Sequence, residues 1–362
     1  MPDPSKHTND SSLSVNKGVD SNPSINPDSR GRARNRREEL SVRDYVDGIK
    51  KGNRTVLSRA ITLIESTRPE HRDLAQEIVE ACLPETGHSI RIGITGVPGV
   101  GKSTFIEALG NHIIQEGHRL AVLAIDPSST RTRGSILGDK TRMETLSNHP
   151  DAFIRPSSTG GSLGGVARKT RETIFLCEAA GFDTIFIETV GVGQSETAVH
   201  SMVDFFLLLM LPGAGDELQG IKRGIMEMAD LIAINKTDSS SKKQVQQAVR
   251  EYKNALRLHP APESGWKPRV TTCSALTREG IGDIWNLIQN YIQLTREHNF
   301  WETRRNRQAK YWMYETIDNQ LREAFYNHPD IKTQLDAYER KVLSGEMSSF
   351  KAARQLLKLY MG

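Results

Sequence analysis

The sequence predicts an α/β protein built on a doubly wound parallel sheet, with helical segments before and after it. Short β-rich runs are apolar on both faces, as in a sheet that helices cover on both sides. Helical stretches separate most of these runs, which is typical of parallel strands joined by crossovers. The runs are 90–95, 120–126, 184–190, 204–211, 230–236 and 269–275.

Composition divides the chain into four segments. Residues 1–36 are rich in Ser, Asn, Asp, Pro and Gly and nearly lack large apolar side chains, so we expect a disordered tail. Apolar residues at helical spacing predict a helical extension over 37–85 and a helical arm over 297–362, on either side of the α/β domain at 86–296. The arm is rich in aromatic residues and needs a surface to pack on. We favour a dimer, and packing on the chain's own domain is the alternative.

The overall composition excludes several classes of protein. A net charge of +4 over 362 residues is too mild to require a nucleic acid, and we interpret the Arg cluster RGRARNRR at 30–37 as a solvated tail. Three scattered cysteines indicate a reducing compartment rather than a disulfide framework. The longest apolar run, 205–211, is far shorter than the roughly 20 residues of a membrane helix, and the amino terminus lacks the apolar core of a signal peptide. We expect a cytoplasmic protein that binds neither membrane nor nucleic acid.

A phosphate-binding loop follows the first predicted strand. The stretch RIGITGVPGVGKST, 91–104, reads strand, glycine loop and helix start, and it satisfies the pattern G-x-x-x-x-G-K-[ST]. In this pattern backbone N–H groups wrap a phosphate, the lysine reaches the β- and γ-phosphate oxygens, and the serine hydroxyl binds Mg²⁺. The residues predicted to bind the nucleotide here are Gly96, Gly99, Gly101, Lys102, Ser103 and Thr104. The loop indicates a nucleoside triphosphate but does not choose its base.

The stretch NKTD, 235–238, at the end of a later strand predicts guanine. Guanine offers an N1–H and an N2 amine side by side, and the Asp238 carboxylate can accept both, whereas adenine lacks the amine. Asn235 would tie this loop to the base and to the phosphate loop, and the Lys236 stem would cover the ring. A second base-contacting loop belongs near residue 275, where the backbone N–H of Ala275 could meet guanine O6. The predicted base-binding residues are Asn235, Lys236, Asp238, Ser274, Ala275 and Leu276.

Acidic residues near the phosphate loop are candidate Mg²⁺ ligands, since Mg²⁺ favours carboxylates beside phosphate. Asp126 ends the second predicted strand, and the alternative is a turn or N-cap aspartate before Pro127. The stretch 129–143 is rich in Gly, Ser and Arg, as a loop over phosphates is, and it carries Asp139 as a second candidate. Its arginines are candidate phosphate clamps or ordinary surface charges: Arg131, Arg133 and Arg142.

The stretch FIETVGVGQSE, 186–196, holds the candidate switch. In many GTPases the acidic loop after such a strand is followed at once by a glutamine that orients water. Here the acid is Glu188, and Val192 stands in the glutamine position. We therefore expect slow hydrolysis until a partner completes the site, because groups supplied in trans can be worth about 10³–10⁵ in rate. Gln194 could substitute after a rearrangement, so the predicted catalytic residues are Lys102, Glu188 and Gln194.

These motifs occur together and in order, and they closely resemble a known family. The stretches are GVPGVGKST, IDPSSTRTRGSILGDKTRM, ETVGVGQSE, LPGAGDELQGIKRGIME and NKTD. They are similar to those of the methylmalonyl-CoA mutase-associated P-loop GTPases, the family of MeaB, mitochondrial MMAA and proteins labelled ArgK. The resemblance covers roughly residues 40–362. It implies a GTPase that binds GTP or GDP with Mg²⁺ and acts as a chaperone of an adenosylcobalamin-dependent acyl-CoA mutase. We favour methylmalonyl-CoA mutase as the client, and isobutyryl- and ethylmalonyl-CoA mutases are the alternatives.

The resemblance also implies roles for particular residues. Lys102 and Ser103 carry over as phosphate and Mg²⁺ residues. Asp126, Asp139 and Glu188 carry over as the acidic set on the Mg²⁺ side. The loop at 213–222 matches a segment that relays nucleotide state to the mutase, and its charged members are Asp216, Glu217 and Lys222. The family further implies a homodimer formed by the carboxyl-terminal helices and an adenosyltransferase as a second partner. Arg133 departs from the family pattern, where we expect a small residue.

The sequence leaves three alternatives to the chaperone function. One is a GTP- or ATP-dependent kinase of a lysine/arginine/ornithine transport binding protein, although no second substrate-base motif is visible. Another is a metal-delivery GTPase, which needs a Cys/His cluster by the nucleotide site; the sequence has no Cys-x-x-Cys or Cys-x-His. The third, a nucleic-acid-binding module using the Arg cluster, leaves the GTPase motifs unexplained.

Overall fold

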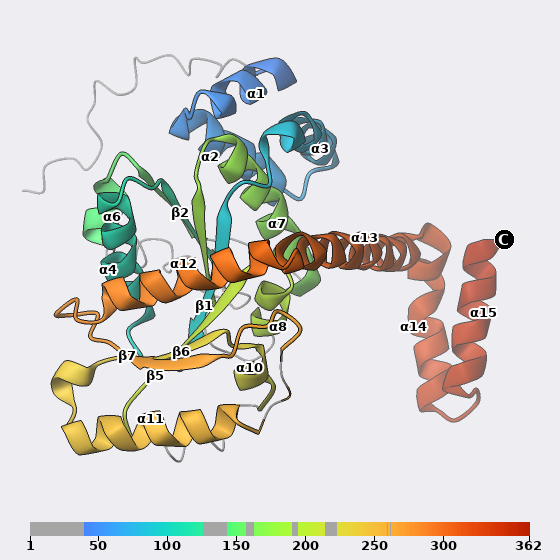
Figure 1. The fold of residues 1–362 in the computed structure, drawn as a ribbon. Helices are drawn as coiled ribbons and strands as arrows, with labels where there is room; N and C mark the ends of the chain where they lie inside the picture. Colours follow the sequence, from blue (N-terminus) through green and yellow to red (C-terminus); the bar gives the residue numbers. More distant parts are fainter. Residues whose placement is uncertain are drawn as a thin grey trace, which may run out of the picture. The chain divides into compact units, whose positions relative to one another are not determined.

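Seven strands form one parallel sheet (Figure 1). The computed structural model describes residues 40–125, 143–156, 163–189, 195–213, 223–258, 260 and 262–362. The strands are β1 (Ile90–Gly96), β2 (Leu120–Ile125), β3 (Ala152–Pro156), β4 (Thr184–Thr189), β5 (Phe205–Met210), β6 (Leu231–Ile234) and β7 (Arg269–Thr272). Their order is β3-β2-β4-β1-β5-β6-β7, and every neighbouring pair runs parallel. The predicted doubly wound sheet is thus confirmed, with β3 as a strand that was not predicted.

Helices surround this sheet and extend the chain at both ends (Figure 1). The helices before and within the sheet are α1 (Val42–Lys50), α2 (Arg54–Glu65), α3 (Pro69–Cys82), α4 (Lys102–Gln115), α6 (Glu144–Asn148), α7 (Leu163–Ala179), α8 (Ser195–His200), α10 (Arg223–Met228), α11 (Lys242–Leu256) and α12 (Ile281–Glu297). The last three are α13 (Phe300–Asn327), α14 (Pro329–Leu343) and α15 (Ser349–Met361). The predicted helical segments at both ends are therefore present.

The two faces of the sheet are covered by different helices because side chains alternate along each strand. On β5, Leu207 and Leu209 belong to the cluster that includes α4 and α12. Leu208 and Met210, which point the other way, pack with α10 and α11. All six β5 side chains are buried, as its unbroken apolar run predicts for a strand covered on both faces.

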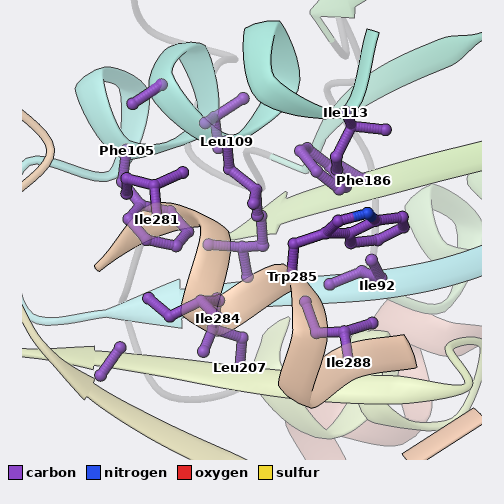
Figure 2. Packing of buried hydrophobic residues seen from close by; sticks show 14 of the residues in the cluster. Ile92, Phe105, Leu109, Ile113, Phe186, Leu207, Ile281, Ile284, Trp285 and Ile288 are labelled. Atoms are coloured by element: carbon purple, nitrogen blue, oxygen red, sulfur yellow. The ribbon is translucent and has the colours of Figure 1, made fainter. Parts of the chain in front are cut away.

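The larger core lies between α4, α12 and the sheet (Figure 2). Leu109 and Ile113 of α4 and Ile284 and Ile288 of α12 pack over the same face of the sheet, and all four are fully buried. Trp285 is also fully buried, and its Nε1 donates a hydrogen bond of 2.7 Å to Glu116 at the end of α4. This packing fixes the start of α4, which follows the phosphate loop.

The helical extension packs on α7. Helices α1, α2 and α3 each contact α7 and one another, and each buries one apolar face. Asn53 caps α2, since its side chain accepts hydrogen bonds from the backbone N–H groups of Thr55 and Val56. Residues 42–362 form one compact unit, so the predicted boundaries at 85 and 296 fall inside it and stay predictions.

The arm begins on the domain and continues as an exposed apolar surface. Trp301, Gln308 and Trp312 in the first turns of α13 are buried. Farther along, large apolar side chains are 40% exposed or more, and they include Tyr314, Ile317, Leu321, Tyr326, Leu343, Phe350, Leu359 and Met361. The structure thus shows packing on the chain's own domain for the first part of α13. Among the described residues, no helix is long and apolar enough to cross a membrane.

Candidate nucleotide site

The phosphate loop joins β1 to α4 at the carboxyl edge of the sheet. Gly96 ends β1, where a Cβ would lie 2.5 Å from the carbonyl oxygen of Leu209 on β5, so only glycine fits. Gly101 has φ +90°, and Gly99 has φ +77°, both in the left-handed region that favours glycine. The helix α4 then begins at Lys102. Its first backbone N–H groups have no partner inside the helix, and the positive end of its dipole lies at the loop. This is the arrangement that binds phosphate.

Lys102 lies folded over the loop. Its Nζ donates hydrogen bonds to the carbonyl oxygens of Gly96 at 2.9 Å and Val97 at 3.4 Å. Burial lowers the pKa of Lys102, while the charges of Glu188 and Glu196 raise it. The ammonium therefore rests on two loop carbonyls within the field of two carboxylates, and an incoming phosphate can replace the carbonyl contacts.

Asn235 connects three loops of the site. Its Nδ2 donates to the carbonyl oxygen of Val100 in the phosphate loop at 2.9 Å. Its Oδ1 accepts from the backbone N–H of Ala275 at 3.0 Å and from the Cys273 thiol at 3.6 Å. Burial raises the pKa of that thiol to about 12, so the thiol keeps its proton and can donate. Lys236 adds a second link to the phosphate loop, because its Nζ donates to the carbonyl oxygen of Gly99 at 2.8 Å.

The N–H of Ala275 is thus engaged by Asn235, although the sequence led us to expect it at guanine O6. The reason is geometric: the predicted strand 269–275 ends at Thr272, and the turn that follows brings Ala275 against Asn235. Gly280 closes this turn, where a Cβ would lie 2.5 Å from the carbonyl oxygen of Thr272.

Asp238 is held by the second base-contacting loop. The Ser274 hydroxyl donates to Asp238 Oδ1 at 2.6 Å, and Ser274 Oγ accepts from the backbone N–H of Thr277 at 3.1 Å. Ser274 is fully buried, whereas Asp238 and Leu276 are exposed. The carboxylate is therefore oriented from behind and remains open to a ligand.

The acidic side of the site is described in part. Glu188 is half-buried on β4, in register with Ile94 on β1, and so lies at the same edge of the sheet as the phosphate loop. Ser103 and Thr104 occupy the first turn of α4. Among the residues that the structure describes, no cluster of three or more His, Cys, Asp or Glu side chains could hold a metal ion. The remaining predicted site residues lie outside the described residues: Asp126, Asp139, Gln194, Asp216, Glu217 and Lys222.

Glu196 is a site residue that the sequence reasoning missed. It is only 1% exposed in the first turn of α8, and its charge acts on Lys102. The Ser195 hydroxyl lies 3.4 Å from its Oε2 and can donate to it. The sequence carries no signal for this role, because an acidic residue in the first turn of a helix is ordinary.

Comparisons with known proteins agree with this geometry. Residues 57–330 match the family described as methylmalonyl Co-A mutase-associated GTPase MeaB. A methylmalonic aciduria type A homolog, mitochondrial, of Mus musculus is 46% identical over 334 residues, which is 90% of this chain and 80% of that protein. GTPase ArgK of Escherichia coli is 44% identical over 305 residues, 84% of this chain and 91% of that protein.

A solved structure has the same fold. The crystal structure of an LAO/AO transport system kinase superposes with a TM-score of 0.71 at 35% identity, covering 89% of this chain and 98% of that one. The family match spans most of the chain, and the site holds a phosphate loop joined to a guanine-type loop. The chain therefore belongs to the methylmalonyl Co-A mutase-associated GTPase family, and it is a GTP-binding, GTP-hydrolysing enzyme.

Proposed function

We propose that this GTPase is a chaperone of an adenosylcobalamin-dependent acyl-CoA mutase, with methylmalonyl-CoA mutase as the client. It would gate cofactor loading by an adenosyltransferase and protect or reactivate the mutase. The observation that carries the nucleotide part is the position of Asn235, which joins the phosphate loop to both base loops. Support for the client comes from the family description and from the name of the mouse relative.

In this function different residues of the site would contact the phosphates and the guanine base of GTP. The loop from Gly96 to Gly101 would wrap the phosphates with backbone N–H groups, and Lys102 would move from the loop carbonyls to the β- and γ-phosphate oxygens. Asp238, held by Ser274, would accept from N1–H and N2 of guanine. Lys236 would cover the ring while its Nζ stays on the loop.

Mg²⁺ fits the donors on this edge of the sheet, since hydroxyl and carboxylate oxygens are the ligands it prefers. We propose that the Ser103 hydroxyl holds it directly, with Glu188 acting through water and with Asp126 and Asp139 completing the acidic side. When bound, the ion would neutralise charge on the β- and γ-phosphates. Glu188 and Gln194 would orient the attacking water. GTP hydrolysis would stay slow until the client contributes a further group to the site.

The arm supports a homodimer. Its later turns leave several large apolar side chains exposed, more than an isolated monomer usually presents in one region. We propose that a second copy covers them. The loop with Asp216, Glu217 and Lys222 would report nucleotide state to the mutase.

The test is GTP hydrolysis by the full chain, alone and with an adenosylcobalamin-dependent acyl-CoA mutase from the same genome. We expect a slow basal rate, strong stimulation by the mutase, and no replacement of GTP by ATP. If no such mutase changes the rate of GTP hydrolysis, the proposed client is wrong, whereas the GTPase activity still holds.

A variant with altered base preference makes the test specific. Asp238→Asn replaces the acceptor for the guanine N2 amine with an amide that can donate to the carbonyl of xanthine at that position. We expect mutase-stimulated hydrolysis of XTP by this variant and not by the wild type. If the variant folds and still prefers GTP, the assignment of Asp238 is wrong.

A kinase of a transport binding protein is the second candidate, because the similar solved structure is described as an LAO/AO transport system kinase. The two functions differ in where the γ-phosphate goes. Labelled phosphate should appear only as inorganic phosphate if the chaperone proposal holds, and on a lysine/arginine/ornithine binding protein if the kinase function holds.

A further inference from the structure

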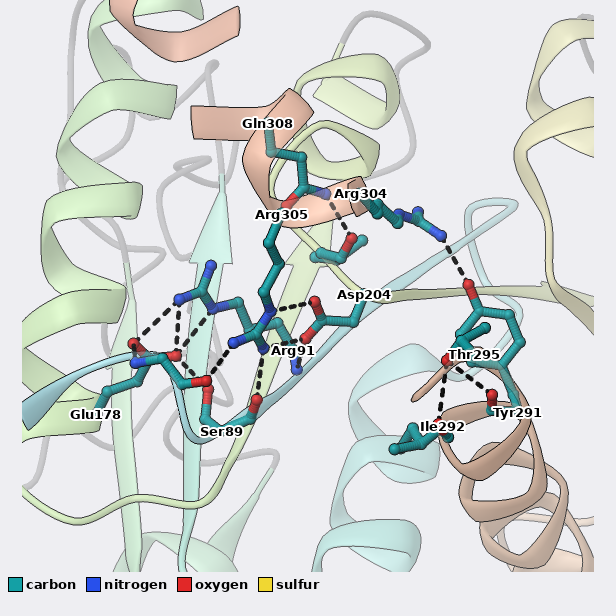
Figure 3. Close-up of polar contacts among 12 residues, drawn as sticks. Ser89, Arg91, Glu178, Asp204, Tyr291, Ile292, Thr295, Arg304, Arg305 and Gln308 are labelled. Atoms are coloured by element: carbon teal, nitrogen blue, oxygen red, sulfur yellow. Dashed lines mark hydrogen bonds and ion pairs between the residues drawn. The ribbon is translucent and has the colours of Figure 1, made fainter. Parts of the chain in front are cut away.

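The base of α13 forms a buried polar joint with several parts of the domain (Figure 3). Arg304 is its central residue, with a side chain only 13% exposed. One nitrogen, Nη1, donates to the Tyr291 hydroxyl on α12 at 2.9 Å, and the same nitrogen lies 3.7 Å from Asp230 Oδ2. The other, Nη2, donates to His200 Nε2 at 3.3 Å. One guanidinium therefore contacts α8, α12 and the short segment between α10 and β6.

Helix α8 connects this joint to the nucleotide site. The helix contacts β1, which ends in the phosphate loop, and β4, which carries Glu188. The charge of Glu196 in its first turn raises the pKa of Lys102, and His200 is its last residue. The two positions are four residues apart on one helix, about 6 Å along its axis. Movement of α8 with the phosphate-site carboxylate must therefore move the imidazole that Arg304 contacts.

A second connection comes through α10. Asp230 lies two residues after the end of α10, and its Oδ2 accepts from the backbone N–H of Phe206 on β5 at 2.9 Å. In the sequence, α10 directly follows the loop 213–222 that we propose as the relay. The helices α8 and α10 also contact each other. Both helices that follow proposed nucleotide-responsive segments thus lead to partners of Arg304, α8 at its last residue and α10 two residues after its end.

The charges in the joint depend on one another. Burial raises the pKa of Asp230 to about 6, and burial together with Arg304 lowers the pKa of His200 to about 4. Burial lowers the pKa of Arg304, but Tyr291, Asp230 and Asp204 outweigh it and hold that pKa above its ordinary value. Because a buried guanidinium without partners is costly, Arg304 must follow these groups when they move.

The rest of α13 is tied to the same region. Trp312 Nε1 donates to the carbonyl oxygen of Ser201 at 3.1 Å, and Gln308 Nε2 donates to that of Val203 at 2.8 Å, both just after α8. Gln308 Oε1 is buried and has no hydrogen-bond partner among the described residues. A buried acceptor of this kind is usually satisfied by a donor or an ordered water, so the joint has room for one further hydrogen bond.

Arg305 differs from its neighbour and serves as an anchor. It pairs with Asp204 at 2.6 Å and donates to the carbonyl oxygen of Ser89 at 2.6 Å, at the edge of the sheet away from the phosphate loop (Figure 3). These partners immediately precede β1 and β5, at the strand ends opposite those that lead into the phosphate loop and the loop 213–222. We therefore expect the contacts of Arg305 to stay in place when the nucleotide changes. The contacts of Arg304 with His200 and Asp230 are the ones that can shift.

We propose that Arg304 couples the nucleotide state of the site to the α13 arm. A displacement of α8 or α10 repositions His200 or Asp230, the guanidinium follows, and α13 turns about its anchor at Arg305. The proposal rests on the proposed nucleotide switch for the motion at the site, and on the contacts of Arg304 for its transmission.

The test is hydrogen exchange of the full chain with GDP and with a non-hydrolysable GTP analogue, each with Mg²⁺. In the wild type we expect exchange over 300–312 to differ between the two nucleotides by about fivefold or more, the lower end of ordinary allosteric coupling. Arg304→Met keeps the apolar stem and should abolish this difference, while peptides from 195–200 still respond. The control Arg307→Met, which breaks only an exposed pair with Glu263, should behave as the wild type.

The outcomes separate the coupling from the switch. If 195–200 responds in the wild type and 300–312 does not, or if Arg304→Met keeps the response of α13, the coupling is wrong and the switch stands. If neither segment responds, both the coupling and the proposed switch fall. Should Arg304→Met not fold, Tyr291→Phe removes one hydroxyl from the joint and should leave a smaller difference over 300–312.

Discussion

Replacing Asn235 by alanine removes the side chain that joins the three loops of the nucleotide site. The carbonyl of Val100 and the backbone N–H of Ala275 would each lose their partner in buried surroundings. A buried polar group left unpaired costs about 1–3 kcal/mol, so the free energy of unfolding should fall by about 2–6 kcal/mol. At about 2 °C per kcal/mol for a chain of this size, the expected fall in Tm is about 4–12 °C.

Thermal unfolding without nucleotide, followed by circular dichroism, measures this effect directly. Titration with a fluorescent GDP and a fluorescent GTP analogue measures the second effect. Both affinities should fall by the same factor, because Asn235 contacts the loops and not the γ-phosphate. Asn254→Ala, at an exposed position of α11, is the matched control and should leave both Tm and affinity unchanged within error.

If the variant has the same Tm as the wild type, neither the Val100 carbonyl nor the Ala275 N–H depends on Asn235 for stability, and the prediction is wrong. A variant that is destabilised but binds guanine nucleotides normally would show that the three-loop junction is structural only. Loss of GTP affinity with GDP affinity intact would place Asn235 near the γ-phosphate, against the geometry described above.

Three further predictions concern other residues. Gly96→Ala puts a Cβ 2.5 Å from the Leu209 carbonyl oxygen and should abolish nucleotide binding in a titration of the folded variant. In the wild type the buried Arg91 guanidinium lies 2.8 Å from the Glu178 carboxylate. Glu178→Gln leaves that guanidinium without a charged partner, so the free energy of unfolding, measured with urea, should fall by about 3–5 kcal/mol. Burial and a neighbouring guanidinium lower the pKa of His200 from 6.5 to about 4, so its contribution to stability is complete above pH 6.5 and is lost as the pH falls toward 4. Between pH 7 and 5 the wild type should therefore lose about 2 kcal/mol more unfolding free energy than His200→Gln, measured by urea titration at both pH values.

The parts of the fold and site that depend on local patterns could be predicted from the sequence. The phosphate loop from Gly96 to Lys102 needs glycines at fixed spacing between an apolar strand and a helix, and all of that is visible in one stretch. The unbroken apolar run of β5 likewise predicts a strand buried on both faces. By contrast β3, with the sequence AFIRP, is five residues long and contains an arginine and a proline, so it lacks the pattern of a buried strand.

Features that depend on packing between distant segments could not be predicted. Arg304 meets His200, Asp230 and Tyr291 only because α13 lies across the ends of three other elements. In the sequence each of these residues is an ordinary polar residue near the end of a helix or strand. The engagement of Ala275 by Asn235 has the same origin, since it depends on where β7 ends.

The order of the strands has a consequence for how the chain is made. In space β4 lies between β1 and β2, so neither of the first two strands can pair with the other. Both of β1's partners, β4 and β5, come about 90 residues or more later in the chain. At about 5–20 residues per second, the ribosome releases β1 roughly 5–20 s before β4 is complete. During synthesis the apolar β1 must therefore be shielded by the helices already made or by a cellular chaperone, and the close packing of Gly96 against Leu209 forms only after β5 has left the ribosome.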